Sequence, residues 1–151
     1  MDALDKEILA QLQADGRLSV TELAERVGLS LSPCHRRVKA LEASGAIAGY
    51  HAQLDPTVLG LGFDSLVFVT MHDARSETLE EFEAAVTSIP HVVMAQRLFG
   101  VPDYLLRVVA ADLTAFQNIY DQRLAKLPGV QRLSSTLVMK RVVEGREFPL
   151  E

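Results

Sequence analysis

The sequence of 151 residues contains one cysteine and no tryptophan. One cysteine cannot form a disulfide within the chain and is too few for a zinc finger. No apolar run approaches the roughly 18 residues that a membrane-spanning helix needs. The acidic residues 1–5 lack the basic and apolar regions of a signal peptide. We therefore expect a cytoplasmic protein that uses no membrane anchor and no metal.

Residues with catalytic chemistry are also few. Cys34 and His35 adjoin, but neighbours on a helix point about 100° apart, so they cannot form a nucleophile–base pair. Cys34 falls on an apolar stripe and is interpreted as a small core residue. No glycine-rich phosphate loop is found, and the other histidines show no metal-ligand spacing: His51, His72 and His91. The sequence predicts no catalytic residue, no cofactor and no enzyme activity.

The charge balance is acidic overall but basic in one short segment. The net charge is −5, with 48% apolar and 23% charged residues, as in globular proteins. Such a charge argues against a protein that coats nucleic acid indiscriminately. Residues 34–41 nevertheless hold three cations and no anion. A basic segment on an acidic body suits a binder that works as two copies on a specific site.

Three helices are predicted in the first 45 residues. The first spans residues 2–14, with Asp2 as its cap and apolar residues at helical spacing. Ser19 opens the second, because Glu22 stands three residues on as in a capping box. Gly28 allows a sharp turn, after which Ser32 is predicted as N-cap and Pro33 as first residue of the third helix. Gly45 then ends that helix.

Two helices joined by a short glycine turn, the second with a basic outer face, predict a helix-turn-helix. Its second helix would enter the major groove of double-stranded DNA. An ordinary helical hairpin with a solvated charged face is the alternative. The DNA contacts are predicted from Ser30, Ser32, Pro33, His35, Arg36, Arg37 and Lys39.

The rest of the chain alternates strand and helix patterns. The segment 46–54 is strand-capable and is interpreted as an extended connector that ends before Pro56. Strands are predicted over 63–72, 92–99, 104–110 and 130–143. A helix capped by Ser76 or Thr78 and another capped by Asp112 lie between them, the second with Leu113 among its inward residues. The order is βαββαβ, that of a ferredoxin-like sandwich.

The predicted fold class is therefore α+β. A winged-helix-like helix-turn-helix domain of residues 1–48 precedes a strand linker of residues 49–60 and a ferredoxin-like domain of residues 61–151. Two helices cover only one face of a four-stranded sheet, so we expect a second copy to cover the other.

The whole chain resembles the Lrp/AsnC ("feast/famine") family of prokaryotic transcription factors. Each matching motif is weak alone, but their order and spacing together are specific. The motifs are Leu4-Asp5-Lys6-Glu7-Ile8-Leu9, Glu22-Leu23-Ala24, Gly28-Leu29-Ser30, Ser32-Pro33-Cys34, Arg37-Val38, Leu41-Glu42, Gly45-Ala46-Ile47, Gly100-Val101-Pro102-Asp103-Tyr104-Leu105-Leu106 and Leu127-Pro128-Gly129-Val130.

The resemblance implies a homodimer that assembles further, to a tetramer or octamer, and a small-molecule effector, usually an amino acid, bound where subunits meet. Asp103 would pair with an ammonium group, and hydroxyls of the last strand would hold a carboxylate. Many family members carry a polar residue where this chain has Val101, which leaves the ligand chemistry open. The implied effector residues are Gly100, Val101, Asp103, Tyr104, Ser134, Ser135 and Thr136. A β-turn without ligand is the alternative for Gly100–Asp103, since turns favour these residues.

The sequence thus predicts a sequence-specific DNA-binding regulator that responds to an amino acid or related molecule. Two alternatives stay open. One is an architectural DNA-binding protein of the same fold without an effector, and the other is a ligand-binding oligomer whose helical domain has lost affinity for DNA.

Overall fold

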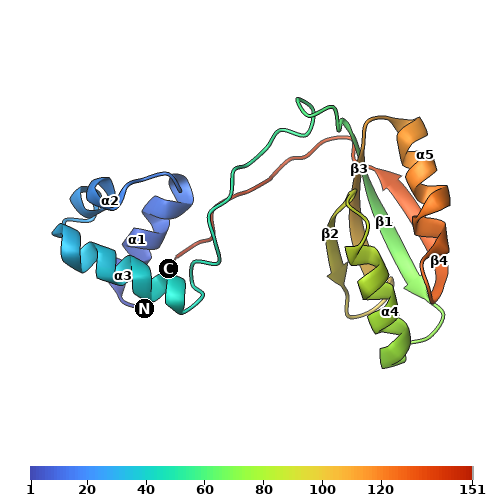
Figure 1. Ribbon diagram of the computed structural model, residues 1–151, viewed down its shortest axis with the longest axis horizontal. Helices are drawn as coiled ribbons and strands as arrows, with labels where there is room; N and C mark the ends of the chain where they lie inside the picture. The colour runs from blue at the N-terminus through green and yellow to red at the C-terminus, as the bar shows by residue number, and fades with distance from the viewer. Residues whose placement is uncertain (151) are drawn as a thin grey trace. The chain divides into compact units, whose positions relative to one another are not determined.

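The computed structural model describes residues 1–150, which form two compact units. The helical unit comprises Met1–Gln53 together with the C-terminal residues from Val142, and the sheet unit comprises Leu54–Arg141. The chain therefore passes between the units twice. The elements are α1 (Ala3–Ala14), α2 (Val20–Arg26), α3 (Leu31–Ala43), β1 (Phe63–Met71), α4 (Ser76–Thr87), β2 (Val92–Arg97), β3 (Tyr104–Ala110), α5 (Leu113–Gln122), the 3-10 helix η1 (Leu124–Lys126) and β4 (Val130–Leu137) (Figure 1).

The first two helices begin as the sequence predicted. The Asp2 carboxylate accepts the Asp5 N–H at 2.9 Å, and the Asp5 carboxylate accepts the Asp2 N–H at 3.0 Å. Ser19 and Glu22 form the same reciprocal capping box at the start of α2. Each box satisfies two N–H groups that a helix end otherwise leaves without partners. Both predicted caps are confirmed.

The start of α3 differs from the prediction. Ser30 is the N-cap residue, with extended backbone, and its carbonyl accepts the Cys34 N–H at 3.2 Å. Ser32 and Pro33 are thus the second and third helical residues, so the predicted cap at Ser32 is wrong. Pro33 fits because N–H groups in the first turn have no partner within the helix, and its missing donor costs no bond. Gly45 follows the helix with φ +77°, which confirms the predicted end.

The three helices share one small core. Cys34 is fully buried in it, and burial raises the pKa of its thiol. Cys34, Val38 and Leu41 form the apolar stripe that the sequence predicted for α3. The buried residues are Ile8, Leu9, Leu23, Ala24, Val27, Cys34, Val38 and Leu41.

The sheet unit has the predicted βαββαβ order. Its four strands lie in the order β2-β3-β1-β4, and every neighbouring pair is antiparallel. Helices α4 and α5 pack on one face, which we call the helix face, because buried residues of both helices join those of the strands in one core. In β1, Val67 and Val69 lie on the helix face, whereas Leu66 and Phe68 lie on the opposite, open face. No described element of the sheet unit covers the open face.

Two details of the sheet-unit helices differ from prediction. Helix α4 begins at Ser76 with Arg75 as N-cap and no side-chain capping bond, so neither Ser76 nor Thr78 caps it. The Asp73 carboxylate instead accepts the Arg75 N–H at 3.0 Å and closes the turn before the helix.

Asp112 caps α5 as predicted. Leu113 was predicted to point inward but is 65% exposed, because it is the first residue of α5 and precedes the turn that meets the sheet.

The predicted connector contains no strand, and the last strand is shorter than predicted. The segment 46–54 contains no strand, since none of its residues joins a sheet in the described chain, and a turn at 56–60 follows. Strand β4 ends at Leu137 rather than Val143. The last backbone bond runs from Val138 N–H to the Asp64 carbonyl at 2.9 Å, where β1 itself begins and no longer offers a partner. Residues from Val142 group with the helical unit, whereas the predicted boundary placed them with the sheet.

Candidate functional site

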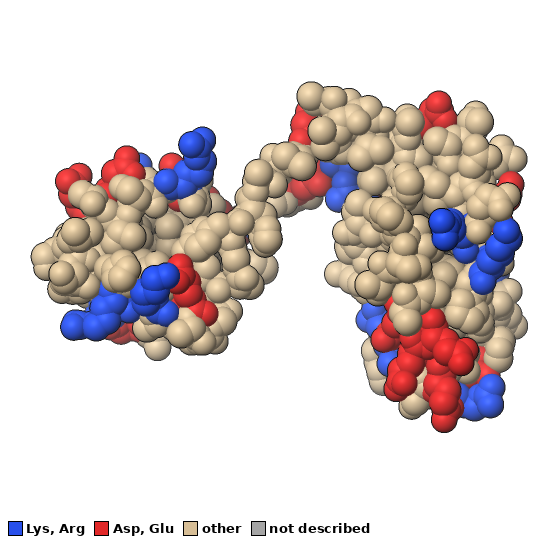
Figure 2. All heavy atoms as spheres, in the orientation of Figure 1, with Lys and Arg blue, Asp and Glu red and all other residues tan. Residues whose placement is uncertain are grey.

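Helix α3 presents a continuous outer face in the helical unit. Ser32, Arg36, Lys39 and Ala43 recur at intervals of four, three and four residues, and all four are exposed. This spacing places them opposite the buried stripe of Cys34, Val38 and Leu41. Lysine and arginine side chains gather over α3 in the space-filling view (Figure 2). We call these four residues the outer face of α3.

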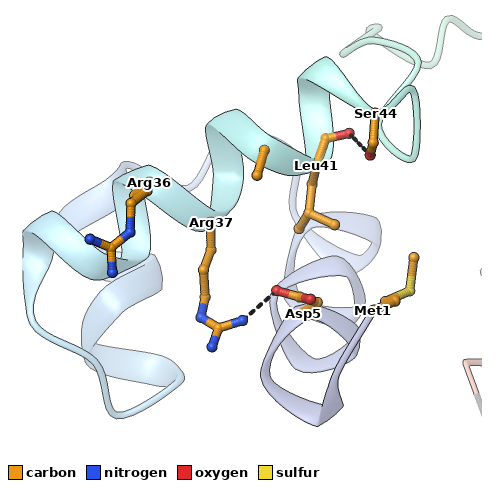
Figure 3. A pocket seen from close by; sticks show the side chains of 7 residues that line it. Met1, Asp5, Arg36, Arg37, Leu41 and Ser44 are labelled. Atoms are coloured by element: carbon orange, nitrogen blue, oxygen red, sulfur yellow. Dashed lines mark hydrogen bonds and ion pairs between the residues drawn. The ribbon is translucent and has the colours of Figure 1, made fainter.

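Arg36 is the cation of this face that is available to a ligand. It is exposed and forms no ion pair or side-chain hydrogen bond with any residue described in the structure. It lies beside an open hollow of about 590 Å³ between α1 and α3 (Figure 3). The hollow is lined by Met1, Asp5, Arg36, Arg37, Ala40, Leu41 and Ser44. Ala40, also exposed, leaves space beside the guanidinium.

Arg37 has a different environment from Arg36. Its Nη1 lies 2.7 Å from Asp5 Oδ1 (Figure 3). The same nitrogen lies 2.8 Å from Asp2 Oδ2. The bonds to Asp5 and Asp2 raise the pKa of Arg37, and the Asp5 N–H and Arg37 lower the pKa of Asp2. Arg37 thus ties α3 to the N-terminal turn of α1. The predicted DNA contact of Arg37 stays a prediction, and the ion pairs of Arg37 with Asp5 and Asp2 compete with it.

Lys39 is also partnered, but loosely. Its ammonium lies 2.8 Å from Glu42 Oε2, which raises the pKa of Lys39, and Tyr50 donates to Glu42 Oε1 at 3.3 Å. The Lys39 side chain is 62% exposed, so the ion pair with Glu42 contributes little and does not prevent contact with a phosphate.

His35 lies exposed on the flank of the outer face, and Ser30 is exposed before the helix. Ala40 and Ala43 were missed by the sequence interpretation. Their spacing from Arg36 was the available signal.

The turn between β2 and β3 carries the predicted effector residues. Gly100 has φ +135°, a backbone conformation that favours glycine, and the Val101–Pro102 bond is cis. The Leu98 N–H donates to the Asp103 carbonyl at 2.7 Å and closes the turn. Val101 is 89% exposed, so an apolar side chain stands at the tip of the turn.

Asp103 has a structural partner in this turn. Its Oδ2 accepts the Met71 N–H at 2.7 Å, and its own N–H donates to the Val69 carbonyl at 2.9 Å. The carboxylate thereby continues the β1–β3 ladder past its last backbone pair. This geometry favours the turn-stabilising role. An ammonium partner would have to share a carboxylate that already holds the end of β1.

Tyr104 is buried, and its side chain lies on the helix face. Its hydroxyl donates to Glu83 Oε1 of α4 at 2.7 Å, and burial together with this bond raises the pKa of Tyr104 to about 12. A cavity of about 300 Å³ lies beside it, lined by Phe82, Glu83, Val86, Thr87, Ala95, Arg97 and Tyr104. Tyr104 therefore links the sheet to α4, and its hydroxyl does not face the turn.

The three predicted hydroxyls of β4 do not share one face of the sheet. Ser135 pairs with Val67 and lies on the helix face, whereas Ser134 and Thr136 pair with Phe68 and Leu66 on the open face. The three cannot bind one carboxylate together. Strand β1 also separates β4 from β3, so one chain does not bring these hydroxyls and the Gly100–Asp103 turn together.

A charged cluster on the open face was not foreseen. Asp64 is 7% exposed, and its carboxylate accepts Arg107 Nε at 3.1 Å and Arg141 Nε at 2.9 Å. Burial alone would raise the pKa of Asp64, but the bonds from the two arginines outweigh it and hold that pKa below its usual value. The only signal in the sequence was a charged residue inside each of two apolar strands.

Two further features are absent from residues 1–150. No three histidine, cysteine, aspartate or glutamate side chains there are grouped so that they could hold a metal ion. None of the helices in this range is long and apolar enough to cross a membrane.

Comparison with known proteins decides the family. Residues 65–148 match the model of the Lrp/AsnC ligand binding domain, and residues 1–48 match that of a winged helix-turn-helix DNA-binding domain. The chain belongs to the Lrp/AsnC family. Its relatives include the proline dehydrogenase transcriptional activator of Rhodobacter capsulatus, 43% identical over 95% of this chain and 94% of that protein. The transcriptional activator DecR of Escherichia coli is 35% identical over all of this chain and 99% of its own length.

Solved structures of Lrp/AsnC regulators have the same fold. A transcriptional regulator of Neisseria meningitidis in complex with L-Met superposes with a TM-score of 0.93 at 38% identity, covering 99% of this chain and 97% of that one. An AsnC family regulator from Agrobacterium tumefaciens gives 0.92 at 37% identity, with the same coverage. The predicted family, fold class and regulatory function are thus confirmed. The chain is a transcriptional regulator with an N-terminal DNA-binding domain.

Proposed function

We propose that this regulator binds a specific operator as a homodimer or larger assembly, with α3 of each copy in a major groove. The observation that carries the proposal is the outer face of α3. It combines the unpartnered guanidinium of Arg36 with Lys39, Ser32 and the small Ala43 on an otherwise acidic chain. Arginine is the commonest reader of guanine in the major groove, and alanine fits against the thymine methyl group.

The open face of the sheet supports self-association. Leu66, Phe68 and Leu105 lie on it half-buried, next to the Asp64 cluster. A second copy would cover these side chains, and a two-fold pair of chains would carry two copies of α3 to adjacent half-sites. Assembly of dimers to a tetramer or octamer is the further expectation.

We propose an amino acid or related small molecule as effector. Residues 65–148 match a ligand-binding domain, and a relative of 38% identity was crystallised with L-Met. Another relative is named as an activator of proline dehydrogenase, an enzyme of amino-acid metabolism. The Gly100–Tyr104 turn of one chain with Ser134 or Thr136 of another is the proposed location. The regulator would act in the cytoplasm, by binding and without catalysis.

Affinity for the regulator's own upstream DNA tests the proposal. Arg36→Ala should weaken binding by about 5- to 150-fold, since a base contact contributes roughly 1–3 kcal/mol and 1.4 kcal/mol is a factor of ten. Arg123→Ala is the matched control, because it removes an equal charge from an exposed site of the sheet unit. Equal affinities of the two variants at physiological salt would rule out Arg36 as a reader of the operator.

The same assay with and without the twenty amino acids separates the alternatives. A shift in DNA affinity with one amino acid supports the ligand-responsive regulator. DNA binding that no amino acid changes would favour the architectural protein. Amino-acid binding without DNA binding would favour the ligand-binding oligomer. Thermal-shift screening with L-Met and L-Pro included would give the ligand independently of DNA.

A further inference from the structure

The C-terminal residues of the chain are docked on α1 of the helical unit. The Gln13 side-chain amide donates from Nε2 to the Phe148 carbonyl at 3.2 Å and accepts the Phe148 N–H at Oε1 at 2.8 Å. Two residues further on, Leu150 packs against the core of the three helices. We call residues 142–150 the tail.

The geometry of this contact is specific for the tail backbone. A primary amide presents an N–H donor and a carbonyl acceptor side by side in one plane, so Gln13 exchanges two hydrogen bonds with the backbone of Phe148 as a paired residue does in a β-ladder. The Phe148 ring takes no part, because it is 79% exposed. A backbone anchor at 148 and an apolar anchor at 150 together fix both the position and the direction of the tail on α1.

Helix α1 is then held at both ends. Near its start, Asp2 and Asp5 bind Arg37 of α3, and near its end Gln13 binds the tail. Helix α3 carries the outer face and is bound to α1 through Arg37. An element that fixes α1 therefore also stabilises the position of α3. The tail begins directly after Arg141, where the chain passes from the sheet unit to the helical unit for the second time.

We infer that the tail is a structural part of the DNA-binding unit, with Gln13 as the positioning residue that docks it. A chain with an undocked tail has a less stable helical core and a lower affinity for DNA, although every residue of the outer face is present. The inference rests on the proposed operator binding only for its effect on DNA. The docking itself is measured without DNA.

Three full-length variants test the docking. Gln13→Ala removes both bonds and keeps a residue that favours helix. Phe148→Pro removes the N–H that Gln13 accepts and keeps the carbonyl that Gln13 donates to. Phe148→Ala is the matched control, because it removes the exposed ring and leaves both backbone groups. Trypsin cleavage after Arg146, followed by mass spectrometry, measures the release of the tail, and hydrogen exchange of α1 measures the stability of the helical core.

We expect Gln13→Ala and Phe148→Pro to raise cleavage after Arg146 roughly three- to tenfold, as expected for loss of one or two hydrogen bonds, and to speed exchange in α1. The double variant should show no more than the larger single effect, because both changes remove the same contact. Cleavage of Gln13→Ala at the wild-type rate would overturn the inference. An effect of Phe148→Ala as large as that of Gln13→Ala would overturn it as well.

DNA affinity completes the test. A release of the tail accompanied by weaker operator binding supports its role in the DNA-binding unit, and release with unchanged affinity would refute that role. If the wild-type protein binds no operator, the proposed function fails, whereas the cleavage and exchange results still decide whether Gln13 docks the tail.

Discussion

Replacement of Asp64 by asparagine should destabilise the sheet unit through its open face. The carboxylate of Asp64 accepts hydrogen bonds from Arg107 at 3.1 Å and from Arg141 at 2.9 Å, and further bonds join the same groups. Asparagine keeps the size of the side chain. It loses the negative charge and presents an amide NH₂ group where both neighbours are donors. Two guanidinium groups then lie close together without an anion between them.

The expected cost follows from the burial of the three groups. Removal of one partner from a buried ion pair costs about 3–5 kcal/mol, and a hydrogen bond to a charged group contributes about 1.5–3 kcal/mol. Arg107 and Arg141 each keep about a quarter of their side-chain surface exposed, at 25% and 27%, so water compensates part of the loss. We therefore expect about 2–3 kcal/mol, which for a unit of this size corresponds to roughly 10–20 °C in Tm.

Urea unfolding followed by far-ultraviolet circular dichroism at pH 7, 5 and 3 measures this cost. The folded pKa of Asp64 lies below its ordinary value of 3.8, so its stabilisation is complete above that value and is lost as the pH falls through the folded pKa. The difference in the free energy of unfolding between wild type and Asp64→Asn should thus be equal at pH 7 and pH 5. It should become smaller at pH 3 and below.

Asp121→Asn is the matched control, because Asp121 is an exposed aspartate of the same unit. It should unfold as wild type at pH 7. A difference of less than about 0.5 kcal/mol for Asp64→Asn at pH 7, within the range of ordinary surface substitutions, would refute the reasoning. So would a difference that remains the same down to pH 2.

Three further outcomes are expected. Gly129→Ala should destabilise the protein by more than about 1 kcal/mol in urea unfolding, since Gly129 has φ +70° and a Cβ there would lie 2.4 Å from Thr78 Cγ2; wild-type stability would contradict this. Tyr104 should ionise only near pH 12 in an ultraviolet titration, and Tyr104→Phe should remove that late phase, because burial and Glu83 oppose ionisation; a late phase that persists would contradict the assignment. Cys34 should react with a thiol reagent only after denaturant is added, and rapid labelling of the native chain would show that its burial is wrong.

Local signals in the sequence were sufficient for most of the fold. The caps at Asp2, Ser19 and Asp112 were predicted because each depends on residues within one helical turn. The start of α3 failed, since Ser30 and Ser32 are both capping residues and the choice between them depends on how α3 packs. The end of β4 failed because it depends on where β1 begins, more than 70 residues earlier.

The candidate sites were predictable only in part. Arg36 and Lys39 follow from helical spacing, which a sequence contains. That Arg37 binds Asp2 and Asp5, and that Gln13 binds Phe148 135 residues away, depends on tertiary contacts without a local signal. The hydroxyls of 134–136 were grouped as consecutive residues. A strand sends consecutive side chains to opposite faces, and that consequence of β4 separates them.

The two chain connections between the units have a consequence for protein engineering. Because residues up to Gln53 and residues from Val142 both group with the helical unit, residues 54–141 are topologically an insertion between Gln53 and Val142. A chimera that fuses the first 53 residues of this regulator to everything that follows in a relative would therefore place a foreign tail beside Gln13. An exchange of 54–141 alone keeps the native tail with its native helix. That cassette, with two junctions, is the natural unit for transferring ligand specificity between members of the family.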